Sequence, residues 1–142
     1  MNTIIALQGP GGKGKTTTIR LLHELLNRHG YHCDSSTFKP VKGDFIATFS
    51  KKGKKIGVTS SGDSYQVVHD HLEKLTGKGC EICICACRTY DRNPKGTIAA
   101  IREFTNYTPI FIAKTIDNNL DTRRMSNERD ANILLTRIES LL

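Results

Sequence analysis

Hydrophobic and polar positions along the chain follow two periods, one typical of strands and one typical of helices. Short apolar runs, each followed by a turn signal, predict strands at 3–7, 31–38, 45–50, 55–59, 81–87 and 109–114. Between these runs, apolar residues recur every three or four positions. This spacing predicts helices over 16–29, 63–76, 97–106 and 127–142. Strands that alternate with helices predict an α/β three-layer sandwich, a mostly parallel sheet with helices on both faces.

One pair of predicted strands departs from this alternation. Only the four residues 51–54 separate 45–50 from 55–59. Such a short connection predicts an antiparallel β-hairpin with Gly53 in its turn, and we expect the hairpin at the edge of the sheet. No linker, repeat or low-complexity tract interrupts the pattern, so residues 1–142 are expected to form a single domain.

Composition narrows the class of partner. The chain has 21 basic and 14 acidic residues, a net charge of +7. This surplus favours an anionic partner: a nucleotide, a phosphorylated substrate, nucleic acid or an acidic membrane. No run approaches the roughly 18 apolar residues of a membrane span, and the first residues lack the pattern of a signal peptide. We therefore expect a cytoplasmic protein.

The segment between the first predicted strand and helix matches the pattern G-x-x-x-x-G-K-[ST]. Glycines let backbone N–H groups surround phosphate oxygens closely, and the helix that follows adds its own unpaired N–H groups. Lys15 is expected to reach the β- and γ-phosphates and to act in catalysis, and the Thr16 hydroxyl to bind Mg²⁺. The nucleotide-binding residues expected from this segment are Gly9, Pro10, Gly11, Gly12, Lys13, Gly14, Lys15, Thr16 and Thr17.

Residues 4–22, with this motif, resemble the P-loop NTPase superfamily. The resemblance implies that Lys15 is the Walker A lysine and that Thr16 is its Mg²⁺ ligand. Gly11-Gly12 also resembles the loop of the deviant Walker A ATPases, although Pro10 stands where their signature lysine would be.

A second, local resemblance concerns Phe38-Lys-Pro-Val-Lys-Gly43. It is similar to the Lys-Pro-Val segment of dethiobiotin-synthetase-like enzymes, in which the lysine faces the substrate. The alternative is an ordinary turn that ends a strand before proline.

The sequence lacks the acid that most P-loop enzymes carry at the end of a strand beside the P-loop strand. The apolar strand 81–87 ends instead in Arg88, which we expect to contact phosphate oxygens as a catalytic residue. Asp63 follows another strand and is the candidate metal ligand. Its alternative role is a helix-capping box with Gln66. Asp91 is a weaker candidate for the missing acid.

Two further features of the sequence leave alternatives open. Arg123 and Arg124 precede Ser126, the predicted N-cap of the last helix, and are candidates for a lid. Cys83, Cys85 and Cys87 alternate along one strand, which favours a buried apolar strand over the alternative, a metal site.

These features predict an ATP-binding protein that uses Mg²⁺, either an NTPase or a small-molecule phosphotransferase. GTP is disfavoured because only Lys114-Thr-Ile-Asp117 approaches the guanine-reading motif. A phosphotransferase would need an acceptor pocket, expected near Lys39, Asp44 and Asp63. One alternative is a nucleotide-dependent switch or partner-activated subunit with little turnover, which the missing acid favours. The other is a nucleic-acid-associated ATPase, suggested by the lysines within 51–55.

Overall fold

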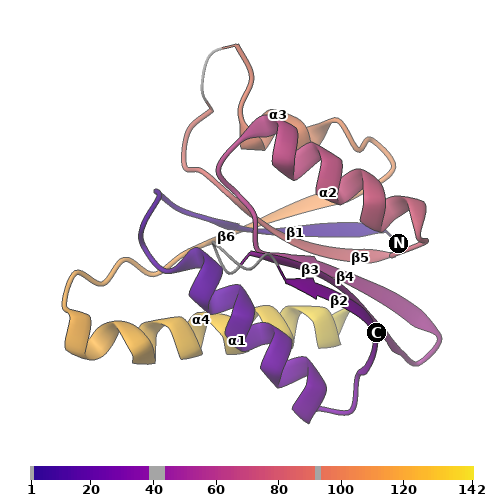
Figure 1. Cartoon of the computed structure of the whole chain (residues 1–142), viewed down its shortest axis with the longest axis horizontal. Helices are drawn as coiled ribbons and strands as arrows, with labels where there is room; N and C mark the ends of the chain where they lie inside the picture. The colour runs from indigo at the N-terminus through magenta and orange to yellow at the C-terminus, as the bar shows by residue number, and fades with distance from the viewer. Residues whose placement is uncertain (1, 39–43, 92–93) are drawn as a thin grey trace.

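The chain forms one six-stranded sheet with helices on both faces, over the residues that the computed structural model describes, 2–38, 44–91 and 94–142 (Figure 1). The strands are β1 (Thr3–Gln8), β2 (His32–Phe38), β3 (Phe45–Lys51), β4 (Lys54–Thr59), β5 (Ile82–Cys87) and β6 (Thr108–Ala113). The helices are α1 (Lys15–Arg28), α2 (Tyr65–Gly77), α3 (Thr97–Arg102) and α4 (Leu120–Ser140). The predicted three-layer α/β sandwich is thus confirmed.

The strand order explains why the loops that follow the parallel strands lie close together. Across the sheet the strands run β2-β3-β4-β5-β1-β6, with β4, β5, β1 and β6 parallel to one another. The antiparallel strands occupy one edge, where β3 and β4 form the predicted hairpin and β2 lies outside it. Lys52 and Gly53 both have positive φ, the conformation that a two-residue hairpin turn requires. The four parallel strands therefore all have their carboxyl ends at the same end of the sheet.

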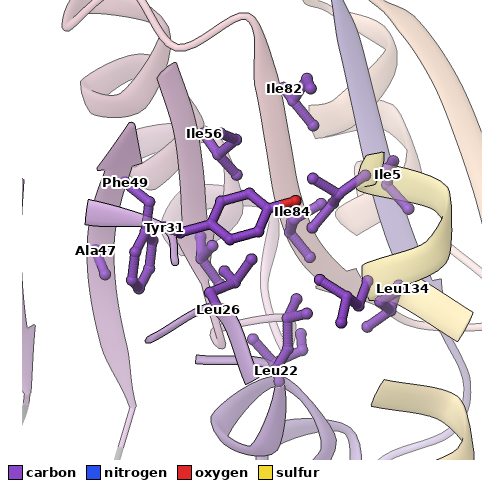
Figure 2. Close-up of a cluster of buried hydrophobic side chains, with 14 of the residues drawn as sticks. Ile5, Leu22, Leu26, Tyr31, Ala47, Phe49, Ile56, Ile82, Ile84 and Leu134 are labelled. Atoms are coloured by element: carbon purple, nitrogen blue, oxygen red, sulfur yellow. The ribbon is translucent and has the colours of Figure 1, made fainter. Parts of the chain in front are cut away.

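The helices divide into two layers. Figure 1 shows α1 and α4 together on one face of the sheet and α2 with α3 on the other. The first layer covers a core that includes Ile5, Leu22 and Ile84, and Figure 2 shows Leu26 and Leu134 pointing into the same cluster from α1 and α4. Because side chains alternate along a strand, the opposite faces of β1 and β5 supply the second core, under α2 and α3.

Strand β5 makes this alternation visible in its own sequence. Cys83, Cys85 and Cys87 all lie in the core under α2 and α3, whereas Ile82 and Ile84 lie in the core under α1 and α4. The interpretation of the cysteines as small buried apolar residues is confirmed. In the part of the chain that the structure describes, no group of three or more His, Cys, Asp or Glu side chains is placed to hold a metal ion.

The last helix differs most from the prediction. Helix α4 begins at Leu120 rather than at residue 127, and its N-cap is Asn119, whose Oδ1 accepts a hydrogen bond from the Asp121 N–H at 2.9 Å. The assignment of Ser126 as N-cap was wrong. Ser126 lies inside the helix, and its hydroxyl donates to Asp117 Oδ2 at 2.9 Å. Among the described residues, no helix combines the length and apolar character of a membrane span.

Candidate functional site

The glycine loop, residues 9–14, connects β1 to α1 at the carboxyl edge of the parallel strands. Gly12 and Gly14 have φ values of 71° and 91°, which glycine adopts without the steric cost that other residues meet. Gly14 is also the N-cap residue of α1, so the helix begins at Lys15 with its first N–H groups directed toward the loop. The loop thus has the strand-before and helix-after setting that its sequence predicts.

A cavity of about 350 Å³ lies against this loop. It is lined by Gly12, Gly14, Lys15, Thr16, Thr17, Asp63, Arg123 and Asn127. Three of these come from segments distant in sequence: Asp63 from the connection between β4 and α2, and Arg123 and Asn127 from α4. The structure therefore brings Asp63 and Arg123 to the predicted loop, together with Asn127, which the sequence does not predict as a site residue.

The Lys15 ammonium group is buried at the floor of the site. Its Nζ donates to the carbonyl oxygens of Gly9 at 2.6 Å and Cys87 at 2.9 Å. Burial lowers the pKa of Lys15, and the neighbouring Arg88 guanidinium lowers that pKa further. An ammonium has three N–H donors, so the two carbonyl bonds leave one for another acceptor.

Thr16 contacts Asp44, an acid that the sequence predicts only for an acceptor pocket. Its hydroxyl lies 3.5 Å from Asp44 Oδ1, which also accepts a hydrogen bond from the Ser60 hydroxyl at 3.1 Å. The Phe45 N–H donates to that same Ser60 hydroxyl, which fixes its position. Three oxygen-bearing side chains therefore cluster beside the start of α1.

Strand direction explains why the sequence does not indicate Asp44 as a metal ligand. In a parallel sheet the acids at the site follow strands, whereas Asp44 stands directly before β3. Because β3 runs antiparallel to β4, the start of β3 lies at the same edge as the carboxyl ends of the parallel strands. Only the pairing direction, which a single sequence does not state, brings Asp44 to the site.

Arg88 and Asp63 form an ion pair over the glycine loop. Arg88 Nη2 lies 3.1 Å from Asp63 Oδ1. The guanidinium also lies against Gly11, since a Cβ at that position would be 2.5 Å from Arg88 Nη1. Arg88 Nε is buried and has no hydrogen-bond partner among the described residues. The structure thus brings both predicted residues to the loop, joined to each other.

The alternative roles of the acids are decided by their contacts. The capping box of Asp63 with Gln66 was wrong, because Ser64 caps α2 by accepting from the Val67 N–H, and Gln66 donates to Asp70. Asp91 accepts hydrogen bonds from the N–H groups of Ile98 and Ala99 and so caps α3. It is not one of the residues that line the cavity. The Lys-Pro-Val resemblance falls in residues 39–43, outside the described part of the chain.

At the far end of the cavity, α4 carries two polar side chains. Arg123 Nε donates to the Asp117 carbonyl oxygen at 2.9 Å, which fixes the plane of the guanidinium. Asn127 is 4% exposed, and its Oδ1 accepts no hydrogen bond from the described residues. The carboxamide lies against Gly14, where a Cβ would be 2.7 Å from Asn127 Oδ1.

The segment that approaches the guanine-reading motif is occupied with internal contacts. Lys114 is fully buried and forms an ion pair with Asp130 at 2.9 Å. The carboxylate of Asp117 accepts from the hydroxyls of Thr122 and Ser126 and from the Asn119 N–H. These hydrogen bonds hold the pKa of Asp117 below its ordinary value. Asp117 therefore stabilises the start of α4, and Lys114 holds the middle of that helix.

A comparison with solved structures finds a chain of similar architecture, a human cancer-related nucleoside triphosphatase studied in solution. The alignment covers 99% of this chain and 98% of that chain, with a TM-score of 0.54 and 13% sequence identity. The two chains share a fold. No protein-family model matches the sequence, and no curated protein matches it significantly.

The charge around the cavity is suited to a compact anion. Lys15, Arg88 and Arg123 approach the loop from three different elements, and Lys13 adds an exposed ammonium that donates to Asn118 at 3.1 Å. The lysines of the β3–β4 turn lie at the opposite end of the strands from the site, because β4 begins at Lys54 and runs toward the site. The cations at the cavity and those of the hairpin are therefore two separate groups.

Proposed function

We propose that this chain binds Mg-ATP beside the glycine loop and cleaves its γ-phosphate as a nucleoside triphosphatase. The observation that carries the proposal is the convergence of the left-handed glycines, the start of α1 and the buried Lys15 ammonium on one cavity. Backbone N–H groups, a helix N-terminus and a fixed cation are the groups that surround a triphosphate in proteins. Gly12, Gly14 and Thr17 line the cavity and would surround the α- and β-phosphates.

Oxygen donors beside Thr16 fit a magnesium ion. Mg²⁺ binds oxygen ligands, commonly one or two protein oxygens together with phosphate and water. Thr16 Oγ1 and the Asp44 carboxylate would hold it, with Ser60 orienting that carboxylate. Once bound, the ion would neutralise charge on the phosphate oxygens. The role of Asp63 as a metal ligand stays a prediction, since its carboxylate accepts from Arg88.

Two cations are placed to act on the γ-phosphate. Lys15 has one N–H donor left for a phosphate oxygen, and the carbonyl bonds hold its ammonium in place. Arg88 lies against Gly11 and would offer its guanidinium to the γ-phosphate oxygens. Fixed cations of this kind stabilise the charge that develops on the transferred group. Asp63 would position Arg88 through their ion pair.

The internal contacts of Lys114 and Asp117 favour ATP over GTP. A guanine site needs a carboxylate that is available to the N1–H and N2–H₂ donors of the base. Asp117 already accepts three hydrogen bonds, and Lys114 is held by Asp130. The residues that come nearest to a guanine-reading motif would have to leave these contacts to read guanine.

A second candidate function is a nucleotide-dependent switch with little turnover. It is favoured by Arg88, which directly follows β5 where most P-loop enzymes carry an acid, and by the ion pair that engages Asp63. In this case the protein would bind Mg-ATP and wait for a partner to supply the missing group.

The test is to measure binding and hydrolysis of Mg-ATP by the purified protein and by three variants. Lys15→Ala should abolish detectable hydrolysis and weaken binding at least about tenfold, because a charged hydrogen bond to the triphosphate is lost. Asp44→Asn should weaken Mg-ATP binding while leaving binding of metal-free ATP nearly unchanged. Lys54→Ala, the same change at the end of the sheet away from the site, is the matched control and should behave as the parent protein.

The outcomes separate the two candidate functions. Phosphate release that disappears in Lys15→Ala supports the nucleoside triphosphatase. Lys15-dependent binding without phosphate release supports the switch instead. If the parent protein binds no triphosphate, or if Lys15→Ala binds it equally well, the proposed site is wrong.

A further inference from the structure

Asn127 is a buried side chain whose polar group lacks a partner within the described chain. It is 4% exposed and lines the cavity, and its Oδ1, which is buried against Gly14, accepts no hydrogen bond from the described residues. A buried amide oxygen without a donor costs on the order of 1–3 kcal/mol. Such a cost is commonly offset by function, and an acceptor in a ligand cavity is matched by a ligand with a donor.

The strand order gives the cavity two distinct ends. One end is formed by Asp63, which follows β4 on the β5 side of β1. The other is formed by Arg123 and Asn127 of α4, which follows β6 on the opposite side of β1. Gly14 and Thr17 lie between the two ends. If the γ-phosphate lies beside Arg88 and Asp63, the nucleoside must extend toward α4.

The two groups at the α4 end fit a flat base with an exocyclic amine. A carboxamide offers an acceptor beside a donor, which matches the amino group and neighbouring ring nitrogen of adenine. Guanine presents two neighbouring donors, N1–H and N2–H₂, which a carboxylate accepts best. The nearby carboxylates of Asp117 and Asp130 are already filled by internal hydrogen bonds. Arg123, held by the Asp117 carbonyl, supplies a fixed plane on which a base can stack.

We propose that Asn127 is the specificity-determining residue of the nucleotide site: its carboxamide would turn from Gly14 toward the ligand, so that Oδ1 accepts a hydrogen bond from the adenine amino group while Arg123 stacks on the base. This inference rests on the proposed function, because it assigns the nucleoside end of the same site. It goes further in naming adenine as the base and a side chain of α4 as the group that reads it.

The experiment compares three probes, Mg-ATP, Mg-GTP and Mg-tripolyphosphate, by calorimetric titration. Tripolyphosphate has no nucleoside, so it reports on the phosphate end alone. The parent protein should bind Mg-ATP at least about tenfold more tightly than Mg-GTP. Asn127→Ala should weaken Mg-ATP about tenfold and leave tripolyphosphate unchanged. Asn127→Asp replaces the amide donor by a second acceptor and should lower the ATP-to-GTP preference by about tenfold or more.

Controls keep the inference separate from folding and from the proposed function. Asn132→Asp introduces the same charge at an exposed position of α4 and should leave the ATP-to-GTP preference unchanged. Unchanged tripolyphosphate binding reports an intact glycine loop in each variant. If both Asn127 variants keep the parent preference, or weaken all three probes equally, the inference is wrong while the triphosphate site stands. If the parent binds none of the probes, or binds them independently of Lys15, the proposed function fails and the inference with it.

Discussion

At the scale of single residues, Gly14 meets two separate requirements. Its φ of 91° lies in the left-handed region, and the Asn127 carboxamide occupies the space where a side chain would begin. Gly12 also has a positive φ, but a Cβ there would have no atom within 4 Å. Gly12 is therefore needed only for its backbone conformation, whereas Gly14 is also needed because the Asn127 side chain leaves no space for a Cβ.

We expect Gly14→Ala to destabilise the protein more than Gly12→Ala. The left-handed backbone costs an ordinary residue about 1–2 kcal/mol at either position. At position 14 the contact with Asn127 should add to this cost. Urea unfolding measures both, and Asn127→Ala in the Gly14→Ala background should remove the excess. Equal destabilisation by the two single changes would contradict the described contact.

The sequence predicted those residues of the site whose role depends on local backbone. The glycine loop could be located because its conformation needs glycine at fixed spacing, and Arg88 because it ends an apolar strand. Asp44 and Asn127 could not be assigned, since each reaches the cavity through the pairing of distant elements. The capping box predicted for Asp63 failed because Ser64, one residue later, accepts the Val67 N–H instead.

At the scale of elements, α4 is tied to the end of β6 by a buried ion pair. Lys114 and Asp130 have side chains that are 0% and 2% exposed. Burial by itself raises the pKa of Asp130, but hydrogen bonds from Lys114, the Thr115 N–H and the Thr115 hydroxyl outweigh it and hold that pKa below its ordinary value. The carboxylate therefore needs to be ionised to hold α4 in place.

We expect Asp130→Asn to lower the free energy of unfolding at neutral pH by about 3–5 kcal/mol, because it leaves the Lys114 ammonium buried and unpaired. The contribution of Asp130 is fully present above the ordinary aspartate pKa of about 3.9 and is lost as pH falls through the lower, folded value. The variant should therefore lose less stability than the parent between about pH 4 and pH 2. Urea unfolding across this range measures both effects.

The exposed Glu73→Gln is the matched control and should change stability by less than about 0.5 kcal/mol. A pH dependence of Asp130→Asn identical to that of the parent would show that this carboxylate does not carry the effect.

Hydrophobic and polar patterning located the strands better than the ends of the helices. Each strand was predicted to within about one residue at either end, whereas α3 ends at Arg102 rather than at residue 106 and α4 begins at Leu120 rather than at residue 127. The larger difference is in α4. Its first two turns extend beyond the core and expose Leu120 and Met125, which are 75% and 70% exposed. Hydrophobic periodicity cannot detect a helical segment that buries no stripe. The signals that mark its start are the capping contacts of Asp117 and Asn119.

At the scale of the whole molecule, the covering of the sheet by helices on both faces divides the five cysteines by exposure. Cys80, Cys83, Cys85 and Cys87 are buried, and only Cys33, among the described residues, is partly exposed. Burial raises the pKa of the Cys80 thiol to about 11 and that of the Cys87 thiol to about 12. These four thiols are therefore protected from modification in two ways: reagents cannot reach them, and few of them are ionised to thiolate at neutral pH.

We expect one thiol to react rapidly with a disulfide reagent in the native protein at pH 8, and five in denaturant. Absorbance of the released thiolate counts the reactive groups. Cys33→Ser should remove the rapid native phase and leave four thiols reactive after unfolding. More than one rapid thiol in the folded parent would contradict the burial of β5.

The alternating cysteines of β5 also set a condition for renaturation. In the extended strand, thiols two residues apart are about 6.5 Å apart along one face and are not oriented to join. Once the chain unfolds, that geometry is gone, and the short spacing makes cross-linking between them easy under air. Such a cross-link forbids the extended strand at the centre of the sheet. The folded protein should therefore tolerate oxidants that trap it once it has unfolded, so recovery from denaturant will depend on a reductant although the native state does not.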